Sequence, residues 1–161
     1  MEVFMNRDDL IISKTNLKGN VTYGNEYFIK ISGYTEQELL NSPHNILRHE
    51  DMPRAVFKLL WDRIQNKESI NAYVKNKTKD GNYYWVYANV TASLDDSNKL
   101  MGYYSVRRKP SQSGIQTISK LYKELVQSES RGGVTSSLKL LEEKLQHAGV
   151  SYDEFINALQ K

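Results

Sequence analysis

The sequence of 161 residues contains no cysteine and only three histidines. The absence of cysteine excludes disulfides, thiolate metal sites, iron–sulfur clusters and cysteine nucleophiles. The histidines, at positions 44, 49 and 147, do not form the i, i+4 pair through which a helix commonly binds a metal ion. The available side chains therefore favour neither a metal centre nor catalysis through a thiol.

Long apolar runs and a strong charge of one sign are also missing. No stretch is long enough to span a bilayer, and residues 1–9 lack the basic and then apolar regions of a secretory signal. We therefore expect a cytoplasmic protein that is not inserted in a membrane. The net charge is +3, and no basic block is dense enough for a nucleic-acid backbone. The basic run at residues 107–109 is interpreted as the solvated end of a strand.

Proline is scarce too, and two of the three prolines, Pro43 and Pro53, enclose the most informative segment, PHNILRHEDMP. It holds two histidines, one arginine and two carboxylates. Prolines restrict the backbone at both ends, which favours a defined loop that could hold a ligand. The alternative is that Arg48 and Asp51 only pair with each other or cap a helix.

The chain begins with a pattern of two short strands, at residues 10–14 and 21–23. Gly19 and its neighbour tolerate the positive φ of a tight turn, so an opening hairpin is expected. A helix is then predicted from Asn25 to Gly33, where a left-handed residue can end it.

Two further helices are predicted before the main strands. Thr35 and Glu38 form a capping-box pattern, which indicates a short helix after residue 35. Pro53 suits the first position of the next helix. Apolar residues there recur with one-face helical spacing, at positions 57, 60, 61 and 64.

Three strand patterns follow, at residues 72–78, 83–94 and 100–109. In the middle strand, the parity of Tyr84 and Val86 suits a core face, whereas that of Trp85 and Tyr87 places bulky rings on the other face. We expect a helix or a partner to cover those rings. The predicted fold class is α+β, with a five-stranded antiparallel sheet and short helices on one side, followed by C-terminal helices.

The last third of the chain is predicted to be helical, over residues 115–127, 136–148 and a final helix after the capping box at Ser151. Residues 128–135 are the expected flexible link. Such short amphipathic helices are unstable alone, so they should pack on the sheet or on another subunit.

Together with this order of elements, the phrases ISGYTEQEL (31–39), PHNILRHEDMP (43–53) and NKTKDGNYYWV (76–86) resemble a PAS sensory domain, and within that superfamily the Aer aerotaxis receptor group. PAS domains of this group bind FAD noncovalently and report redox state to the chemotaxis machinery. Because no transmembrane or long methyl-accepting segment follows, the chain most resembles stand-alone CetB-type energy-taxis proteins. The resemblance covers residues 10–110 and not the tail. The expected organisation is therefore an N-terminal cap segment (1–9), a PAS domain (10–110) and a C-terminal helical extension (111–161).

The resemblance also implies which residues bind the flavin. Arg48 can donate a fork of hydrogen bonds to ring carbonyls or to the pyrophosphate, and Asn76 offers a donor and an acceptor to the ring. Trp61 and Phe57 can wall in a planar group, with plain core packing as the alternative. The full implied set is Asn25, Arg48, His49, Asp51, Phe57, Trp61 and Asn76.

The expected function is that of a cytoplasmic FAD redox sensor for aerotaxis, which signals to a separate membrane chemoreceptor-type protein; a homodimer is also considered. Two alternatives stay open: a haem gas sensor with His44 or His49 as ligand, and a cofactor-free interaction module. The second gains support from one departure, because Ser69 and Ile70 stand where the family commonly has Pro-Trp. No nucleophile, base and orienting group occur together, so no enzymatic activity is expected.

Overall fold

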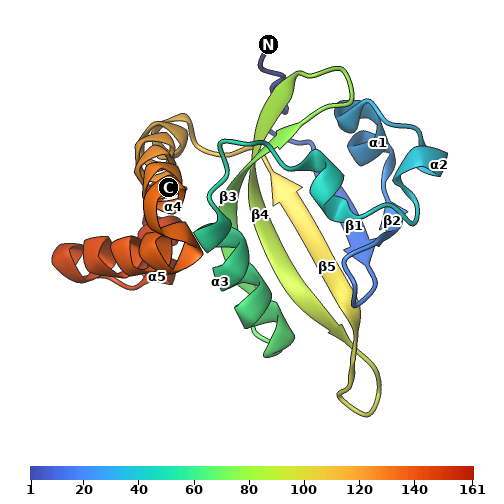
Figure 1. Cartoon of the computed structure of the whole chain (residues 1–161). Helices are drawn as coiled ribbons and strands as arrows, with labels where there is room; N and C mark the ends of the chain where they lie inside the picture. Colours follow the sequence, from blue (N-terminus) through green and yellow to red (C-terminus); the bar gives the residue numbers. More distant parts are fainter.

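The structure is a computed structural model that describes all residues from Met1 to Lys161. One antiparallel sheet with the strand order β2-β1-β5-β4-β3 forms its centre (Figure 1). The strands are β1 (Ile11–Thr15), β2 (Val21–Gly24), β3 (Ile70–Lys77), β4 (Tyr83–Leu94) and β5 (Leu100–Arg108). The predicted α+β class with a five-stranded antiparallel sheet is confirmed.

Four short helical segments lie between β2 and β3: α1 (Glu26–Ser32), α2 (Glu36–Leu39), the 3₁₀ helix η1 (His44–Leu47) and α3 (Arg54–Gln65). Local sequence signals set the ends of these helices. Asn25 caps α1 by accepting a hydrogen bond from the Phe28 amide, and Gly33 ends it at φ 78°. Thr35 and Glu38 form the predicted capping box of α2.

The predicted opening hairpin is present as β1 and β2, with Gly19 at φ 85° in its turn. The outer edge of β2 is covered by the chain that follows α2. The Val21 amide donates to the Ser42 carbonyl at 2.9 Å, and the Val21 carbonyl accepts from the Asn41 amide at 2.7 Å. This contact ties the start of the proline-bounded segment to the sheet.

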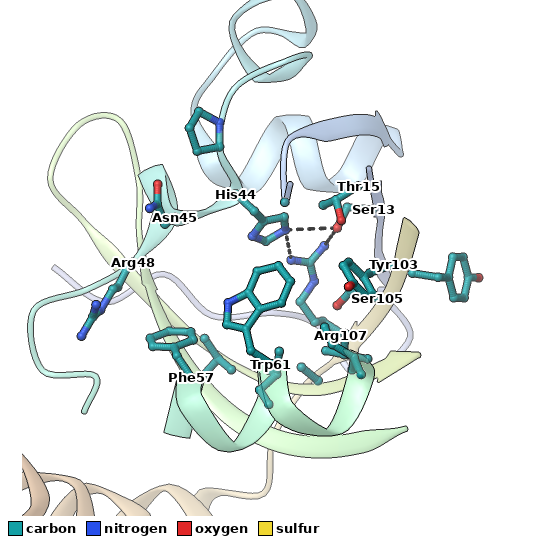
Figure 2. Close-up of a pocket in the computed structure, with 18 of the residues that line it drawn as sticks. Ser13, Thr15, His44, Asn45, Arg48, Phe57, Trp61, Tyr103, Ser105 and Arg107 are labelled. Carbon is teal, nitrogen blue, oxygen red and sulfur yellow. Dashed lines mark hydrogen bonds between the residues drawn. The ribbon is translucent and has the colours of Figure 1, made fainter. Parts of the chain in front are cut away.

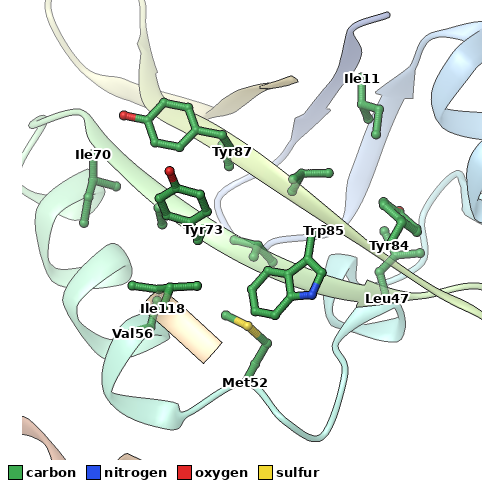
Figure 3. Close-up of a cluster of buried hydrophobic side chains, with 14 of the residues drawn as sticks. Ile11, Leu47, Met52, Val56, Ile70, Tyr73, Tyr84, Trp85, Tyr87 and Ile118 are labelled. Atoms are coloured by element: carbon green, nitrogen blue, oxygen red, sulfur yellow. The ribbon is translucent and has the colours of Figure 1, made fainter. Parts of the chain in front are cut away.

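The two faces of β4 pack against different helices. Its inner face, with buried Tyr84 and Val86, belongs to the side that α3 covers. On the outer face, the Trp85 ring stacks on Tyr122 with 6.2 Å between centroids, and the Tyr87 hydroxyl donates to Asn157 at 3.0 Å. The prediction that a helix or partner covers these rings is therefore confirmed. Figure 3 shows the side chains of Trp85 and Tyr87 on β4.

The C-terminal helices are α4 (Gln112–Ala148) and α5 (Tyr152–Leu159). Gly133, at φ 73° and ψ −167°, breaks α4 into two halves. The halves run antiparallel, because Ser128 bonds to Ser136 at 2.6 Å and Glu124 pairs with Lys144 at 2.6 Å. The flexible link expected at residues 128–135 is wrong: these residues are helical except at Gly133, and contacts between the halves hold them.

The C-terminal helices also close the outer edge of β3. The Tyr122 hydroxyl donates to the Tyr73 carbonyl at 2.6 Å, and the Tyr152 hydroxyl donates to the Asn71 carbonyl at 2.8 Å. An unpaired strand edge is a template for unwanted pairing. The expectation that these helices pack on the sheet is thus confirmed. None of the helices combines the length and apolar character needed to cross a membrane.

Candidate ligand-binding cavity

A cavity of about 290 Å³ lies between the inner face of the sheet, α3 and the segment from Pro43 to Arg48 (Figure 2). Its volume is near the lower end of the ~300–1,000 Å³ typical of small-molecule sites. Lys18 and Gly19, from the turn between β1 and β2, also belong to its lining. The cavity is large enough for a fused ring system.

Helix α3 supplies the apolar wall of the cavity. The residues predicted to share one helix face all line it: Phe57, Leu60, Trp61 and Ile64. The Trp61 ring meets Tyr103 edge-on with 5.3 Å between centroids. A Cβ atom at Gly19 would lie 3.3 Å from the Trp61 ring, so glycine there allows the turn to approach it closely. The aromatic stripe therefore faces a cavity rather than a closed core.

Asn76 brings a polar group to the sheet wall of the cavity. It lies on β3, is 4% exposed and forms a backbone bridge with Arg48, which joins the proline-bounded segment to the sheet. Its carboxamide lies near the buried hydroxyl of Tyr84, the residue paired with it across the sheet. The carboxamide is not one of the buried polar atoms that lack a partner, and it belongs to the cavity lining, so Asn76 can offer a donor and an acceptor to a ligand.

A second polar group, Arg107, stands on the inner face of β5. It is 2% exposed; Nη1 bonds to His44 Nε2 at 3.0 Å, and Nη2 donates to Ser13 Oγ at 2.6 Å. The guanidinium lies 4.8 Å from the Phe28 ring centroid, and its Nε has no partner. Burial lowers the pKa of Arg107 to about 10, which leaves it charged at neutral pH.

His44 completes this polar cluster as an uncharged acceptor. Because the arginine can only donate, His44 Nε2 must be unprotonated in the shared hydrogen bond. Desolvation and, secondly, the charge of Arg107 lower the pKa of His44 to about 3. Its ring stacks on Phe28 with 5.8 Å between centroids. Arg107 is therefore held by neutral groups and by an aromatic face.

The charge of the cavity lining has one sign. Lys18, Arg48 and Arg107 belong to it, and no aspartate or glutamate does. Such a cavity favours ligands that present carbonyl oxygens or negative charge.

Four of the seven residues implied by the resemblance line the cavity: Arg48, Phe57, Trp61 and Asn76. Arg48 lies over the Phe57 ring at 4.9 Å and donates to the Met52 carbonyl at 3.0 Å. It does not pair with Asp51, which was the alternative considered for it. A role for these four in binding stays a prediction.

The other three, Asn25, His49 and Asp51, lie outside the lining. The Asn25 carboxamide accepts from the Ile12 amide at 3.1 Å and so ties α1 to β1. His49 Nδ1 accepts from the Asp51 amide at 3.0 Å, and Asp51 pairs with Lys75 at 2.7 Å. The hydrogen bond to Lys75 lowers the pKa of Asp51. These three side chains therefore stabilise segments outside the cavity lining.

Sequence reasoning missed the polar cluster of Ser13, His44 and Arg107. The interpretation of residues 107–109 as a solvated strand end is wrong for Arg107, which is buried, and right for the exposed Arg108. The alternation of side chains along β5 could have identified Arg107. Tyr103, Ser105 and Arg107 are alternate residues of this strand, so they lie on the same face of the sheet, and all three line the cavity. His44 was weighed only as a haem ligand.

The departure at Ser69 and Ile70 lies outside the cavity. Neither residue belongs to the lining, and Ile70 is 2% exposed within the hydrophobic core. Val90, which pairs with Ile70 across the sheet, belongs to the lining instead.

Comparisons with known proteins agree with this architecture. The aerotaxis receptor of Escherichia coli K12 is 39% identical over 118 residues, which are 73% of this chain and 23% of the receptor. The nitrogen fixation regulatory protein of Klebsiella pneumoniae is 28% identical over 97 residues, 60% of this chain and 20% of that protein. The chain thus spans about a fifth of the length of these relatives.

The fold comparison gives the same result. A light-oxygen-voltage domain studied with a flavin analogue superposes with a TM-score of 0.60 at 19% identity, covering 71% of this chain and 86% of that one. Residues 21–107 match the family model of the PAS fold, so the resemblance stated from the sequence is confirmed. Because this match covers more than half of the sequence, the chain belongs to the PAS-fold family.

Proposed function

We propose that this chain binds FAD in the cavity and senses redox state for aerotaxis, passing the signal to a separate membrane-bound chemoreceptor-type protein. One observation carries the flavin assignment: Asn76 brings a carboxamide, with both a donor and an acceptor, to a cavity that Trp61 walls. The 39% identity to an aerotaxis receptor supports the sensory role.

The residues present fit a flavin ring. Its planar faces match the apolar wall of Phe57 and Trp61, and its carbonyl and N–H groups match the donor and the acceptor of the Asn76 amide. Arg48 and Lys18 are cations available to the phosphates of FAD. In this proposal Asn25, His49 and Asp51 hold the surrounding loops rather than the ring.

A bound flavin would accept and return electrons, and the protein would supply binding, orientation and electrostatics. Asn76 is the proposed switch residue, because its carboxamide can present either oxygen or N–H to the ring. It lies on β3, whose carbonyls at Asn71 and Tyr73 bond to tyrosines of the C-terminal helices. A change at Asn76 could thus reach α4 and α5, provided that these contacts differ between two states.

The C-terminal helices are the proposed output surface, and their partner would be the chemoreceptor-type protein. The second assembly to be considered is a homodimer formed through the same helices.

The two alternative functions have less support. A haem sensor needs a free histidine, but His44 Nε2 bonds to Arg107 and His49 lies outside the cavity. A cofactor-free module would be expected to fill its pocket with side chains, whereas about 290 Å³ remains open.

An absorption spectrum of gently purified protein, with the released cofactor identified by chromatography, tests the proposal. We expect oxidised flavin bands and released FAD; colourless protein that refuses added FAD would refute it. Asn76→Ala should weaken flavin binding, whereas Asn89→Ala, on the outer face of the sheet, should leave it unchanged.

A further inference from the structure

Arg107 carries a buried positive charge that no carboxylate in the protein compensates. Its guanidinium has five N–H donors. Protein acceptors take one hydrogen bond from each terminal nitrogen, and Nε has none. A buried charge is costly unless it is paired and fully hydrogen-bonded, so this arrangement calls for a further acceptor.

Within the protein, the Tyr84 hydroxyl also lacks a hydrogen-bond partner and acts on the charge of Arg107, but this hydroxyl is neutral. A negative charge has to come from a ligand in the cavity, because Arg107 belongs to the lining and no acidic residue does. Figure 2 shows the guanidinium bonded to Ser13 and His44 beside Trp61, the residue proposed to cover the ring. The protein thus positions a cation at the cavity without neutralising it.

The neutral state of His44 is part of this arrangement. A protonated His44 could not accept from Arg107 and would repel it, and the lowered pKa of His44 agrees with its role as an acceptor. Ser13 Oγ accepts the second terminal nitrogen. Both side chains are therefore positioning residues that orient the guanidinium.

We propose that Arg107, oriented by Ser13 and His44, binds the electron-rich edge of the flavin and favours the reduced ring over the oxidised one. This inference rests on the proposed function, because it requires a flavin in the cavity. It adds a residue that sets the redox potential at which the sensor responds.

The physical reason is the charge that the ring gains. A chemical donor such as dithionite delivers two electrons, and when only one proton accompanies them the ring acquires one negative charge. A fixed guanidinium in a cavity of low dielectric attracts that charge more strongly than it attracts a neutral carbonyl. Arg107 should therefore raise the midpoint potential.

The test is a reductive titration of Arg107→Gln and Arg108→Gln against an equilibrating dye, together with the affinities for oxidised and reduced FAD. Arg108 is the matched control, because it is the next residue of β5 and is exposed on the opposite face. In Arg107→Gln we expect the affinity for reduced FAD to fall at least tenfold more than that for oxidised FAD. This lowers the midpoint potential by about 30 mV for each tenfold change, and Arg108→Gln should not shift it.

Two variants of the positioning residue His44 keep the inference testable if Arg107→Gln fails to fold. His44→Leu removes the acceptor and should lower the potential, whereas His44→Gln, which keeps an acceptor oxygen, should restore most of it. FAD bound with an unchanged potential in Arg107→Gln, or in His44→Leu if the arginine variant is unfolded, would overturn the inference alone. Wild-type protein that binds no flavin would overturn the proposed function as well.

Discussion

The carboxylate of Glu129 accepts a hydrogen bond of 2.8 Å from the backbone amide of Arg54, 75 residues earlier in the chain. Its second oxygen accepts from the Ala55 amide at 2.9 Å. Helix α3 begins at Arg54 after Pro53, and no side chain near Pro53 caps it. A residue of α4 therefore caps the helix that walls the cavity.

The first prediction concerns this cap. A carboxylate at a helix N-terminus satisfies free amides and interacts favourably with the helix dipole, and the loss of such a cap costs about 1–2 kcal/mol. We expect Glu129→Ala to lower the free energy of unfolding in urea by this amount. Glu124→Ala, which breaks only the exposed pair with Lys144, should cost less than about 1 kcal/mol. Equal losses in the two variants would argue against a capping role.

The second prediction concerns the two tyrosines at the β3 edge. Tyr122→Phe removes a buried hydrogen bond and leaves the Tyr73 carbonyl without its donor. Such a loss costs about 1–3 kcal/mol, and Tyr152→Phe should behave similarly. Tyr23→Phe is the control, because Tyr23 is 46% exposed. Thermal unfolding of the three variants compares them, and a Tyr122→Phe variant as stable as Tyr23→Phe would contradict the prediction.

The third prediction concerns pH. The pKa of His44 falls from 6.5 to about 3 on folding, so between these values the unfolded chain binds a proton that the folded chain does not. The contribution of His44 to the free energy of unfolding is therefore complete above pH 6.5. It is lost as the pH falls below that value, by at most about 1.4 kcal/mol per pH unit.

The neutral variant His44→Gln separates this effect from other titrating groups. Between about pH 7.5 and about pH 5, the free energy of unfolding should fall by about 1–2 kcal/mol more in the wild type than in the variant. Parallel pH profiles would show that His44 titrates normally in the folded protein.

The fourth prediction concerns the aromatic wall and depends on the proposed flavin. An aromatic contact contributes about 0.5–1.5 kcal/mol beyond its buried area, so Trp61→Ala should weaken FAD binding at least tenfold, and Trp61→Phe should weaken it less. Trp85→Phe, on the outer face of the sheet, should leave the affinity unchanged. Isothermal titration calorimetry measures all three. A wild-type affinity in Trp61→Ala would place the ligand elsewhere.

The local elements could be predicted from the sequence because their signals are local. The stop at Gly33, the capping box at Thr35 and the spacing of Phe57 and Trp61 each act within a few residues, and each appears as expected. The exposure of Arg107 could not be inferred from its charged neighbours, because strand alternation and the packing of distant segments decide it.

Long-range contacts explain the other failures. The helices on either side of Gly133 pack together, with a hydrogen bond between Ser128 and Ser136. No local sequence pattern predicts this contact. Of the three implied residues outside the cavity, Asn25 and Asp51 bond to distant elements, through Ile12 and Lys75, whereas His49 bonds within its own segment. Sequence alone could not distinguish a ligand contact from a structural one at these positions.

The coverage of both outermost strands limits how this molecule can associate. At one end of the sheet, residues 41–44 occupy the backbone groups of Val21 and Gly19; at the other, Tyr122 and Tyr152 occupy those of β3. Addition of a strand from another chain alongside these covered residues would first require the cover to detach. A complex that leaves the covers in place is therefore built from helix surfaces, the open part of the outer sheet face or the remaining part of β2.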